Sequence, residues 1–493
     1  MLVSQLSLPD SFEACYLEYN RVFPLETTAT HVRVATSRDP DPDVLAELER
    51  EFGLPVELVS VTDEELLDAV RYAYAAAESI IEVLNDLRTS DGFSGADDQA
   101  LADARDLASQ PPVIKYVNLL IKDAHTARAS DIHLESTVQG LRSRFRVDGV
   151  LADAPAPPPQ AQAAIVSRVK LLAELDIAER RAPQDGSFRI RLESRELDIR
   201  VSTVPTLYGE SVVLRLLDRG GQPVSPDELG MAPAMLEQFK AIIARPTGIV
   251  IAAGPTGSGK TTTLYSALAL RDTTAEKVIT VEDPVEYHLG GVTQIPVNRK
   301  AGMTFASALR SVLRQDPDVV MVGEMRDPET ATIAVQAAMT GHLVFSTLHT
   351  NDAPSAVTRL LDLDVAPYQI AASVNGVLAQ RLVRRICPHC RERYQPDPQV
   401  VSFLSGEPEG GRHLVRGCGC PACRGTGYSG RIGIFELLVV SEDLNRAISA
   451  REPLARLRDL AEGGGMQAMK HDGWVKVLAE ITTVEEVLRV TAH

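Results

Sequence analysis

The sequence predicts a multidomain α/β protein built around a parallel sheet that binds phosphate at one edge. Residues Gly254–Thr261 form a complete G-x-x-x-x-G-K-[ST] pattern between an apolar run and a helical segment. Two further apolar runs, 278–281 and 319–322, each lead into a carboxylate, as buried parallel strands with polar tips do. A chain of 493 residues is too long to fold around a single hydrophobic core, so we expect about two to four domains.

The N-terminal part of the sequence predicts two smaller α/β domains ahead of this sheet. Residues 1–85 predict a module with strands at 31–35 and 56–61 and helices at 42–52 and 63–87. Residues 86–110 are rich in Ser, Gly, Ala and Asp, which predicts a flexible linker. Residues 111–218 predict a second domain with helices at 111–127 and 161–175 and strands at 131–135, 141–147, 187–192 and 196–201. The phosphate-loop domain follows over 219–493, after a hinge at 220–223.

The negative charge is concentrated at the beginning of the chain. The formal net charge is −17, and residues 1–110 contain 23 acidic and 7 basic side chains. This region does not suit nucleic acid and fits a basic protein partner, although a purely solubilising surface explains the charge equally well. Because no signal peptide is evident and no stretch reaches ~18 apolar residues, we expect a cytoplasmic protein without a membrane span.

The loop itself predicts nucleotide binding. Its glycines allow backbone N–H groups to approach a polyphosphate, and the following helix adds a partial positive charge. Lys260 would reach the β- and γ-phosphates, and the Thr261 hydroxyl would hold Mg²⁺. A surface turn that matches by chance is the alternative, but the apolar run 249–253 before the loop argues against it. We therefore predict that the chain binds and hydrolyses a nucleoside triphosphate.

Carboxylates, histidines and arginines around the predicted strands are the further candidates. Carboxylates at the tips 282–286 and 324 would order Mg²⁺ and polarise water, while a capping or ion-pair role stays open, more for Glu282 than for Glu324. His342 and His349 bracket the apolar run 343–347 and are candidates for γ-phosphate sensing or nucleophile positioning. Arg310 and Arg314 share one face of a helix predicted at 304–315; they form surface salt bridges or stabilise transferred charge.

Two C-x-x-C pairs predict a metal site within residues 386–432. The pairs are Cys387 with Cys390 and Cys420 with Cys423, a pattern typical of a tetrahedral Cys₄ zinc site. Cys418 is a spare thiol close by, and His389 and His413 are weaker alternatives. Zinc ribbons also occur in nucleic-acid proteins, and several arginines lie nearby. The single Trp in the chain weakens that interpretation, because stacking side chains are sparse.

These motifs together resemble the four signature boxes of secretion and pilus ATPases. Gly254–Thr261 looks like the Walker A box, 281–286 like the Asp box, 316–327 like the Walker B box, and 340–350 like the His box. The tetracysteine insert followed by 425–431 resembles the type II secretion and pilus-assembly branch. Segments 129–135 and 146–149 resemble the second N-terminal domain of that family, and residues 1–85 resemble the shorter N-terminal module of the type II secretion E subunit.

The resemblance implies a RecA-like P-loop motor domain preceded by smaller α/β domains, the second of them PAS-like, with a zinc-binding insert. It implies a homohexamer that uses ATP, Mg²⁺ and Zn²⁺, with Glu324 and Glu286 organising metal and water and with Arg200 and Arg215 facing the phosphates. The other nucleotide-site and subunit-contact residues that it implies are Gly254, Pro255, Thr256, Gly257, Ser258, Gly259, Lys260, Thr261, Thr262, Asp283, Arg310, Arg314, Arg326 and Arg359.

The resemblance further implies a function in type II secretion. ATP turnover would drive assembly of a pseudopilus and protein export across the outer membrane. The acidic N-terminal module would dock on the cytoplasmic domain of an inner-membrane platform protein, which would attach the chain peripherally to the membrane. A type IV pilus-assembly ATPase is the nearest alternative. A nucleic-acid translocase is a third, and the nearly balanced charge after residue 110 argues against it.

Overall fold

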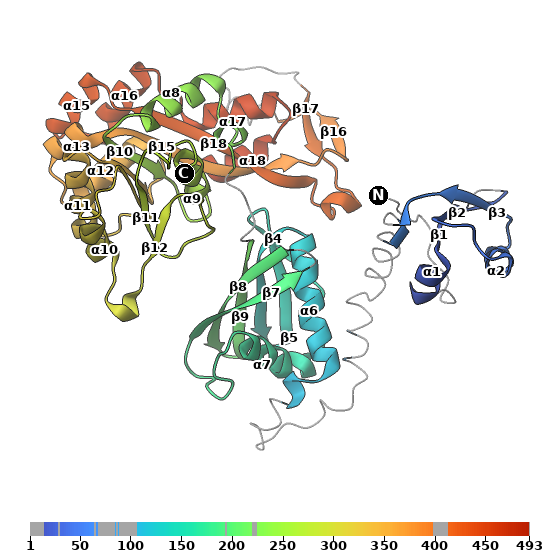
Figure 1. The fold of residues 1–493 in the computed structure, drawn as a ribbon. Helices are drawn as coiled ribbons and strands as arrows, with labels where there is room; N and C mark the ends of the chain where they lie inside the picture. Colours follow the sequence, from blue (N-terminus) through green and yellow to red (C-terminus); the bar gives the residue numbers. More distant parts are fainter. Residues whose placement is uncertain are drawn as a thin grey trace.

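The computed structural model of the chain confirms the predicted α/β class (Figure 1). It describes residues 14–27, 30–63, 66, 67, 84, 87, 106–192, 195–218, 224–397 and 413–492. Most of the helix predicted at 63–87, and most of the linker predicted at 86–110, lie outside the described residues. Within the described part of the chain, no helix is both long and apolar enough to cross a bilayer.

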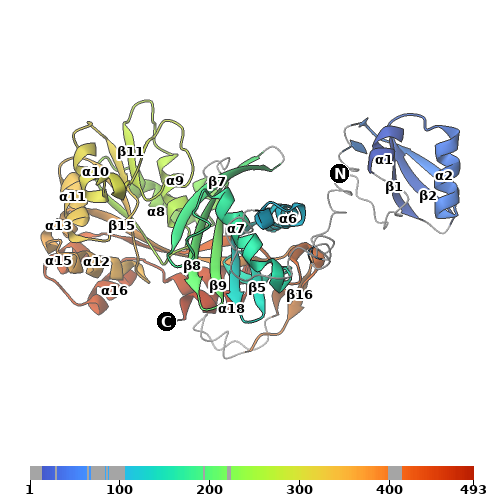
Figure 2. The same cartoon turned by 90° about the horizontal axis from the view of Figure 1, so that it is seen from below.

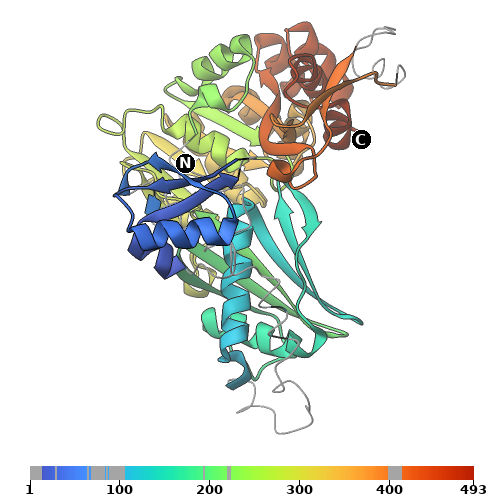
Figure 3. The same cartoon turned by 90° about the vertical axis from the view of Figure 1, so that its right-hand side faces the viewer.

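The N-terminal module is a three-stranded sheet with a helix against it (Figure 3, blue). Its elements are α1 (Ala14–Asn20), β1 (Val22–Thr27), β2 (Val32–Thr36), α2 (Pro42–Phe52) and β3 (Val56–Ser60), with strand order β1-β2-β3. Helix α2 begins after the Asp41 cap, with Pro42 in its first turn, and ends at Gly53, where φ is 65°. The predicted strands and helix are present here, and α1 and β1 are additional to the prediction.

The second domain is a six-stranded antiparallel sheet with two helices on one face (Figure 2). Its elements are α6 (Pro111–Thr126), β4 (Ala129–Thr137), β5 (Gly140–Val147), β6 (Val150–Asp153), η2 (Pro159–Ala161), α7 (Gln162–Leu172), β7 (Gln184–Leu192), β8 (Arg195–Thr206) and β9 (Gly209–Asp218). The strand order is β6-β5-β4-β9-β8-β7. Strands β6 and β9 are additional to the prediction, and β9 is central because it pairs with both β4 and β8.

The core of this second domain begins earlier in the chain than predicted. Leu84 and Leu87 are buried together with apolar residues of α6, such as Val113 and Val117. Ala108, inside the predicted linker, is also fully buried. Leu84 and Leu87 therefore contribute to the core of the second domain and not to that of the N-terminal module.

The phosphate-loop domain is a seven-stranded sheet between two helical layers (Figure 1). Its sheet, in the order β12-β11-β13-β14-β10-β15-β18, is parallel except for the edge strand β18. The strands are β10 (Gly248–Ala253), β11 (Val278–Glu282), β12 (Thr293–Pro296), β13 (Val319–Val322), β14 (Leu343–Leu348), β15 (Val374–Ile386) and β18 (Tyr428–Val439).

The helices of this domain divide between the two faces of the sheet. The layer with η3 (Pro226–Glu228), α8 (Pro233–Ile243) and α9 (Lys260–Leu268) packs against the even-numbered side chains of β10, such as Val250 and Ala252. The opposite layer packs against Ile249 and Ile251 and contains α10 (Phe305–Val312), α11 (Pro328–Met339), α12 (Ala353–Asp362), α13 (Pro367–Ser373), α15 (Glu442–Ser449) and α16 (Leu454–Gly463). The short helix η4 (Arg299–Ala301) follows β12.

A small cysteine-bearing subdomain extends from the end of β15. It contains β16 (Arg391–Tyr394), β17 (Leu414–Gly417) and η5 (Pro421–Cys423), and α17 (Met469–Leu478) and α18 (Val484–Thr491) pack beside it. Glu486 of α18 accepts hydrogen bonds from the Arg384 backbone N–H (2.9 Å) and guanidinium (2.7 Å). Burial alone would raise the pKa of Glu486, but the bonds from Arg489 and Arg384 lower it to about 2. The C-terminal helices are thereby fastened to β15 through a charge-assisted clamp.

Hydrogen bonds and an ion pair join the second domain to the phosphate-loop domain. The Asp148 carboxylate, in the turn between β5 and β6, accepts the N–H of Gly430 at 2.8 Å and lies 3.6 Å from the Arg431 guanidinium. On the nucleotide side, the Arg200 guanidinium of β8 donates to the Val285 carbonyl at 3.4 Å. The second domain therefore touches both the cysteine-side hairpin and the end of β11.

Candidate functional site

The phosphate-binding sequence forms the turn between strand β10 and helix α9. All six residues of β10 are buried, and the strand ends at the carboxyl edge of the sheet. Gly254 has φ 152°, and a Cβ there would lie 2.5 Å from the Ser258 Oγ. Gly259 caps α9 with a left-handed φ of 89°. Glycine is needed at both positions, and the turn presents the first N–H groups of α9 to solvent at the sheet edge.

Lys260 lies folded over this turn. Its Nζ donates to the carbonyl oxygens of Gly254 (2.8 Å) and Pro255 (2.9 Å), and the residue is 8% exposed. Burial lowers the pKa of Lys260 to about 8; the nearby Glu324 opposes that shift and Arg381 adds to it. The Lys260 ammonium group therefore lies at the turn, and the protein neutralises its positive charge only in part.

Glu324 lies two residues beyond the end of β13, close enough to the turn for its charge to act on Lys260. Its side chain is 12% exposed and pairs with the Arg326 guanidinium at 2.5 Å and with the His349 Nε2 at 3.3 Å. His349 follows β14, which lies between β13 and β10 in the sheet. Three adjacent strand ends therefore bring Lys260, Glu324 and His349 to one edge, as predicted for a parallel sheet.

Glu286 faces arginines from the second domain. Burial raises its pKa, while the charges of Arg200 and Arg215 oppose that rise. Arg200 reaches the neighbouring Val285 carbonyl, and the Arg215 Nε is held by Asp131 at 2.8 Å. A half-buried carboxylate with a raised pKa beside two guanidinium groups is the arrangement expected of a proton acceptor near developing negative charge.

Glu282, by contrast, is occupied within the core. It is 3% exposed and accepts hydrogen bonds from the hydroxyls of Thr280 (2.5 Å) and Tyr265 and from the Gln294 amide (3.2 Å). This geometry supports a structural role for Glu282, which was one of the two roles left open for it.

His342 lies at the wrong end of its strand for the predicted role. It precedes β14, its Nδ1 lies 2.9 Å from the Ala337 carbonyl, and its own carbonyl accepts the N–H of Gly248 at the start of β10. The six residues of β14 separate it from His349 by about 20 Å of strand. The structure brings His349 and not His342 to the phosphate loop.

The remaining predicted residues are mostly exposed around the sheet edge. Asp283 accepts a hydrogen bond from Arg299 at 3.0 Å. Arg310 pairs with Glu329, Arg314 donates to the Arg310 carbonyl, and Arg359 is exposed in the last turn of α12. Pro255, Thr256 and Gly257 of the turn are exposed, while Thr261 and Thr262 are half-buried in the first turn of α9.

Arg381 is a residue at this site that the sequence reasoning missed. It is 5% exposed, donates to the Asn351 carbonyl and side-chain oxygens at 3.1 and 3.2 Å, and lies close enough to influence Lys260. In the sequence Arg381 is one of several arginines that precede or follow the first cysteine pair, which indicates no role at the phosphate loop. Two adjacent polar residues, Gln380 and Arg381, inside the apolar run 377–383 were the available signal.

The four predicted cysteines converge on one point. The Sγ atoms of Cys387, Cys390, Cys420 and Cys423 all lie within 4.8 Å of one another. Adjacent pairs are 3.7–3.8 Å apart, whereas Cys418 is exposed and outside this group. Burial acts to raise the pKa of Cys423, but the N–H groups of Cys420 and Gly427, at 3.1 and 3.2 Å, outweigh it and lower that pKa to about 6.

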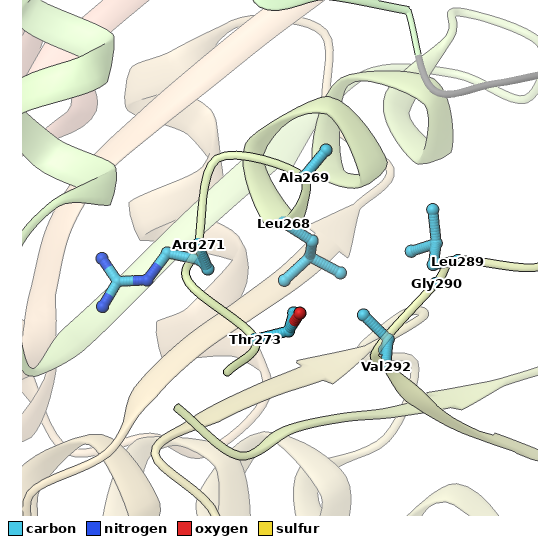
Figure 4. Close-up of a pocket in the computed structure, with 7 residues that line it drawn as sticks. All are labelled: Leu268, Ala269, Arg271, Thr273, Leu289, Gly290 and Val292. Atoms are coloured by element: carbon cyan, nitrogen blue, oxygen red, sulfur yellow. The ribbon is translucent and has the colours of Figure 1, made fainter. Parts of the chain in front are cut away.

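A pocket at the opposite end of α9 is distinct from the phosphate loop (Figure 4). It has a volume of ≈ 160 Å³ and is lined by Leu268, Ala269, Arg271, Thr273, Leu289, Gly290 and Val292. Arg271, its one charged residue, already pairs with Glu276 and donates to the Ile243 carbonyl. The phosphate loop, which is open at its edge, is therefore the better candidate site.

Comparison with known proteins shows which families the chain is similar to. Residues 106–489 match the family described as Type II/IV secretion system protein, and residues 3–80 match the MshEN domain. "Type II secretion system protein HxcR" of Pseudomonas aeruginosa is 48% identical over 444 residues, which covers 90% of this chain and 91% of that protein. Proteins named Type II secretion system protein E, from Xanthomonas campestris pv. campestris among others, are 43–47% identical.

Two further relatives come from pilus machinery. "Type IV pilus assembly ATPase PilB" of Thermus thermophilus is 47% identical over 380 residues, covering 76% of this chain but 43% of that protein. The solved structure "Pilus Retraction Motor PilT and Bound ADP" has a TM-score of 0.52 at 26% identity, and covers 76% of this chain and 96% of that one.

Proposed function

The chain belongs to the Type II/IV secretion system protein family and is an ATP-hydrolysing motor enzyme, and we propose that it powers a type II secretion system as a homohexamer. In this proposal ATP turnover drives assembly of a pseudopilus and thereby protein export across the outer membrane. One observation carries the choice of system: the similarity to HxcR extends over nine-tenths of both chains, whereas the similarity to PilB covers less than half of that longer protein. Type IV pilus assembly remains the second candidate because the identity in the shared part is equally high.

The site supports hydrolysis by positioning and charge. The N–H groups of the turn would hold the phosphates of ATP, and Lys260 would move from the Gly254 and Pro255 carbonyls to the β- and γ-phosphates. The Thr261 hydroxyl would bind Mg²⁺, which neutralises phosphate charge. Glu324 would order that ion and the attacking water, with His349 fixing its orientation.

Residues at the end of β11 and in the second domain would complete the reaction. Glu286, with its raised pKa, would accept the proton of the attacking water. Arg200 and Arg215 would stabilise the charge that develops on the transferred phosphoryl group. Because these arginines belong to another domain, hydrolysis and domain movement are coupled in this proposal.

A homohexamer would give the outer arginines a function. Arg310, Arg314, Arg326 and Arg359 are exposed in the single chain and lie on the domain that carries the nucleotide site. In a ring, such cations face the neighbouring subunit and can stabilise phosphate charge or subunit contacts there. Asp283 and Thr262 would contribute at the nucleotide itself.

The cysteine group fits one Zn²⁺ per chain. A tetrahedron with Zn–S bonds of about 2.3 Å has S···S edges of about 3.8 Å, close to the 3.7–3.8 Å between adjacent sulfurs here. The N–H groups beside Cys423 lower its pKa and favour the thiolate that metal binding requires, while burial raises the pKa of Cys387 and Cys390. Zinc would fasten the two C-x-x-C turns together and have a structural role.

We expect protein purified without chelator to contain one zinc per chain by elemental analysis. Cys390→Ser should lose the metal and unfold at a lower temperature, because three thiolates do not complete the tetrahedron. Cys418→Ser is the matched control and should keep full zinc content. Zinc-free wild-type protein, or loss of zinc from the control, would contradict this assignment.

The N-terminal module is the proposed dock on a basic cytoplasmic domain of an inner-membrane platform protein. All nucleotide-site residues and the cysteine group lie beyond residue 110, while residues 1–110 carry almost all of the net charge. The match of residues 3–80 to a separate domain model supports an independent module. Charge complementarity would favour and orient its docking.

Deletion of residues 1–80 tests this function, since it keeps Leu84 and Leu87 in the core of the second domain. The shortened chain should hydrolyse ATP but leave the membrane fraction, and exported proteins should disappear from the medium while surface pili remain. A full-length Lys260→Ala chain is the control and should still sediment with membranes. Sedimentation of the shortened chain with membranes would move the dock elsewhere, and loss of pili with intact export would favour the pilus-assembly alternative.

A further inference from the structure

Strand β15 places a polar side chain directly beside the phosphate loop. Ala253, the last residue of β10, pairs with Ala379, so Gln380 stands where β10 turns into the loop. Gln380 is 1% exposed, and its Nε2 donates to the Ser258 carbonyl at 2.7 Å. The buried side-chain amide of Gln380 donates a hydrogen bond to a carbonyl of the loop. This contact is directional, unlike the packing of an apolar side chain in the core.

This contact determines where the next N–H points. The Ser258 carbonyl and the Gly259 N–H belong to one peptide unit, and among the described residues only the Asp283–Pro284 bond is cis. In a trans peptide the C=O and the N–H point in opposite directions. With the carbonyl held against Gln380 on β15, the Gly259 N–H points away from that contact.

We propose that Gln380 is a positioning residue for nucleotide binding, which aims the Gly259 N–H at the phosphates. The proposal rests on the nucleotide-binding function of the loop. The amide is held in the donating orientation, because the flipped amide would place two oxygen atoms 2.7 Å apart. Its strand is held as well, since Arg381 donates to the Gln380 carbonyl at 3.1 Å.

The close packing around Gln380 supports the same role. A Cβ on Gly259 would lie 3.0 Å from the Gln380 Nε2, and a Cβ on Gly254 would lie 2.7 Å from the Gln380 carbonyl oxygen. The glycines of the loop thus allow it to approach β15 closely enough for the hydrogen bond. The Gln380 Oε1 is buried and has no hydrogen-bond partner among the described residues, so donation to Ser258 is the contact that the amide makes.

Gln380→Met tests the proposal, because methionine keeps the length of the side chain and removes the donor. We expect the Kd for Mg-ADP, measured by calorimetry, and the KM for ATP each to rise about tenfold. The kcat should change by less than about threefold, because a phosphate contact made equally in the ground and transition states affects binding alone. Gln380→Glu should raise Kd further, since its carboxylate would oppose the Ser258 carbonyl.

Asn375→Leu is the matched control on the same strand. The Asn375 Nδ2 donates to the Thr247 carbonyl at 2.8 Å, the same kind of bond at the opposite end of β10. We expect it to lower Tm as Gln380→Met does, with unchanged Kd for Mg-ADP. A wild-type Kd in Gln380→Met, or an equal rise in Asn375→Leu, would overturn the proposal. Wild-type protein that binds Mg-ADP without hydrolysing ATP would instead contradict the proposed motor function.

Discussion

Replacement of Lys260 by alanine is expected to reduce ATP hydrolysis about a thousandfold or more, with the fold intact. The change removes the positive charge that would contact the β- and γ-phosphates as negative charge shifts during transfer. Among the residues that the structure describes, the hydrogen bonds of this amine go to the carbonyl oxygens of Gly254 and Pro255 at the turn. Phosphate release and thermal unfolding, measured on the same preparation, separate loss of chemistry from loss of structure.

A surface lysine provides the control for this result. Lys240, in α8, pairs with the exposed Asp227 at 3.1 Å, and Lys240→Ala should hydrolyse ATP at the wild-type rate. Near wild-type turnover in Lys260→Ala would refute the motor assignment.

The pH dependence of Mg-ADP binding should reflect the protonation of the Lys260 amine. Burial holds the pKa of Lys260 near 8 in the free protein, and bound phosphates would raise it. Binding then takes up a proton above pH 8, so the Kd for Mg-ADP should rise as pH increases through this range. The rise should be absent from Lys260→Ala, and calorimetry in two buffers of different ionisation enthalpy would measure the proton uptake directly.

Glu324→Gln should bind ATP and hydrolyse it about a hundredfold more slowly or worse. The amide keeps the shape of the side chain and removes the charge that would order Mg²⁺ and the attacking water. It also weakens the contacts to Arg326 and His349, which hold the carboxylate at the sheet edge. Single-turnover hydrolysis together with Mg-ATP binding would show the separation of chemistry from affinity.

Glu237→Gln is the matched change at an exposed carboxylate. Glu237 lies in α8 and pairs with Lys240 at 3.7 Å, and neither residue belongs to the proposed site, so this variant should keep wild-type turnover. If Glu324→Gln also kept wild-type turnover, the role of metal and water organiser would pass to Glu286.

Much of the nucleotide site was predictable because local pattern determines it. A buried strand, a glycine-rich turn and a helix are adjacent in sequence at 248–268, so no long-range contact was needed to recognise them. Each cysteine pair was equally local, and the structure brings the four sulfurs together as the two pairs predicted. The carboxylate Glu324 followed from one further rule, that parallel strands end at a common edge.

Other features depended on tertiary structure. His342 and His349 bracket the same strand symmetrically in sequence, and only the direction of β14 within the sheet shows which of them reaches the loop. The sequence of β9 does not alternate between apolar and polar residues as a strand with one exposed face does, so it was not predicted. Its pairing with β4 and β8 makes it a central strand of the sheet. Gln380 lies 122 residues from Ser258, so its contact follows from the register of β15 against β10 and not from any local motif.

The contact between Asp148 and Gly430 also implies an order of folding steps during synthesis of the chain. The two residues are separated by 282 positions in the chain. At a synthesis rate of about 5–20 residues per second, a ribosome needs roughly 14–56 s to travel from one to the other. The second domain, complete by residue 218, can fold during that delay, before its partner hairpin exists. Docking of the second domain on this hairpin is therefore a late step of folding, because the hairpin is completed after every residue of the proposed nucleotide site.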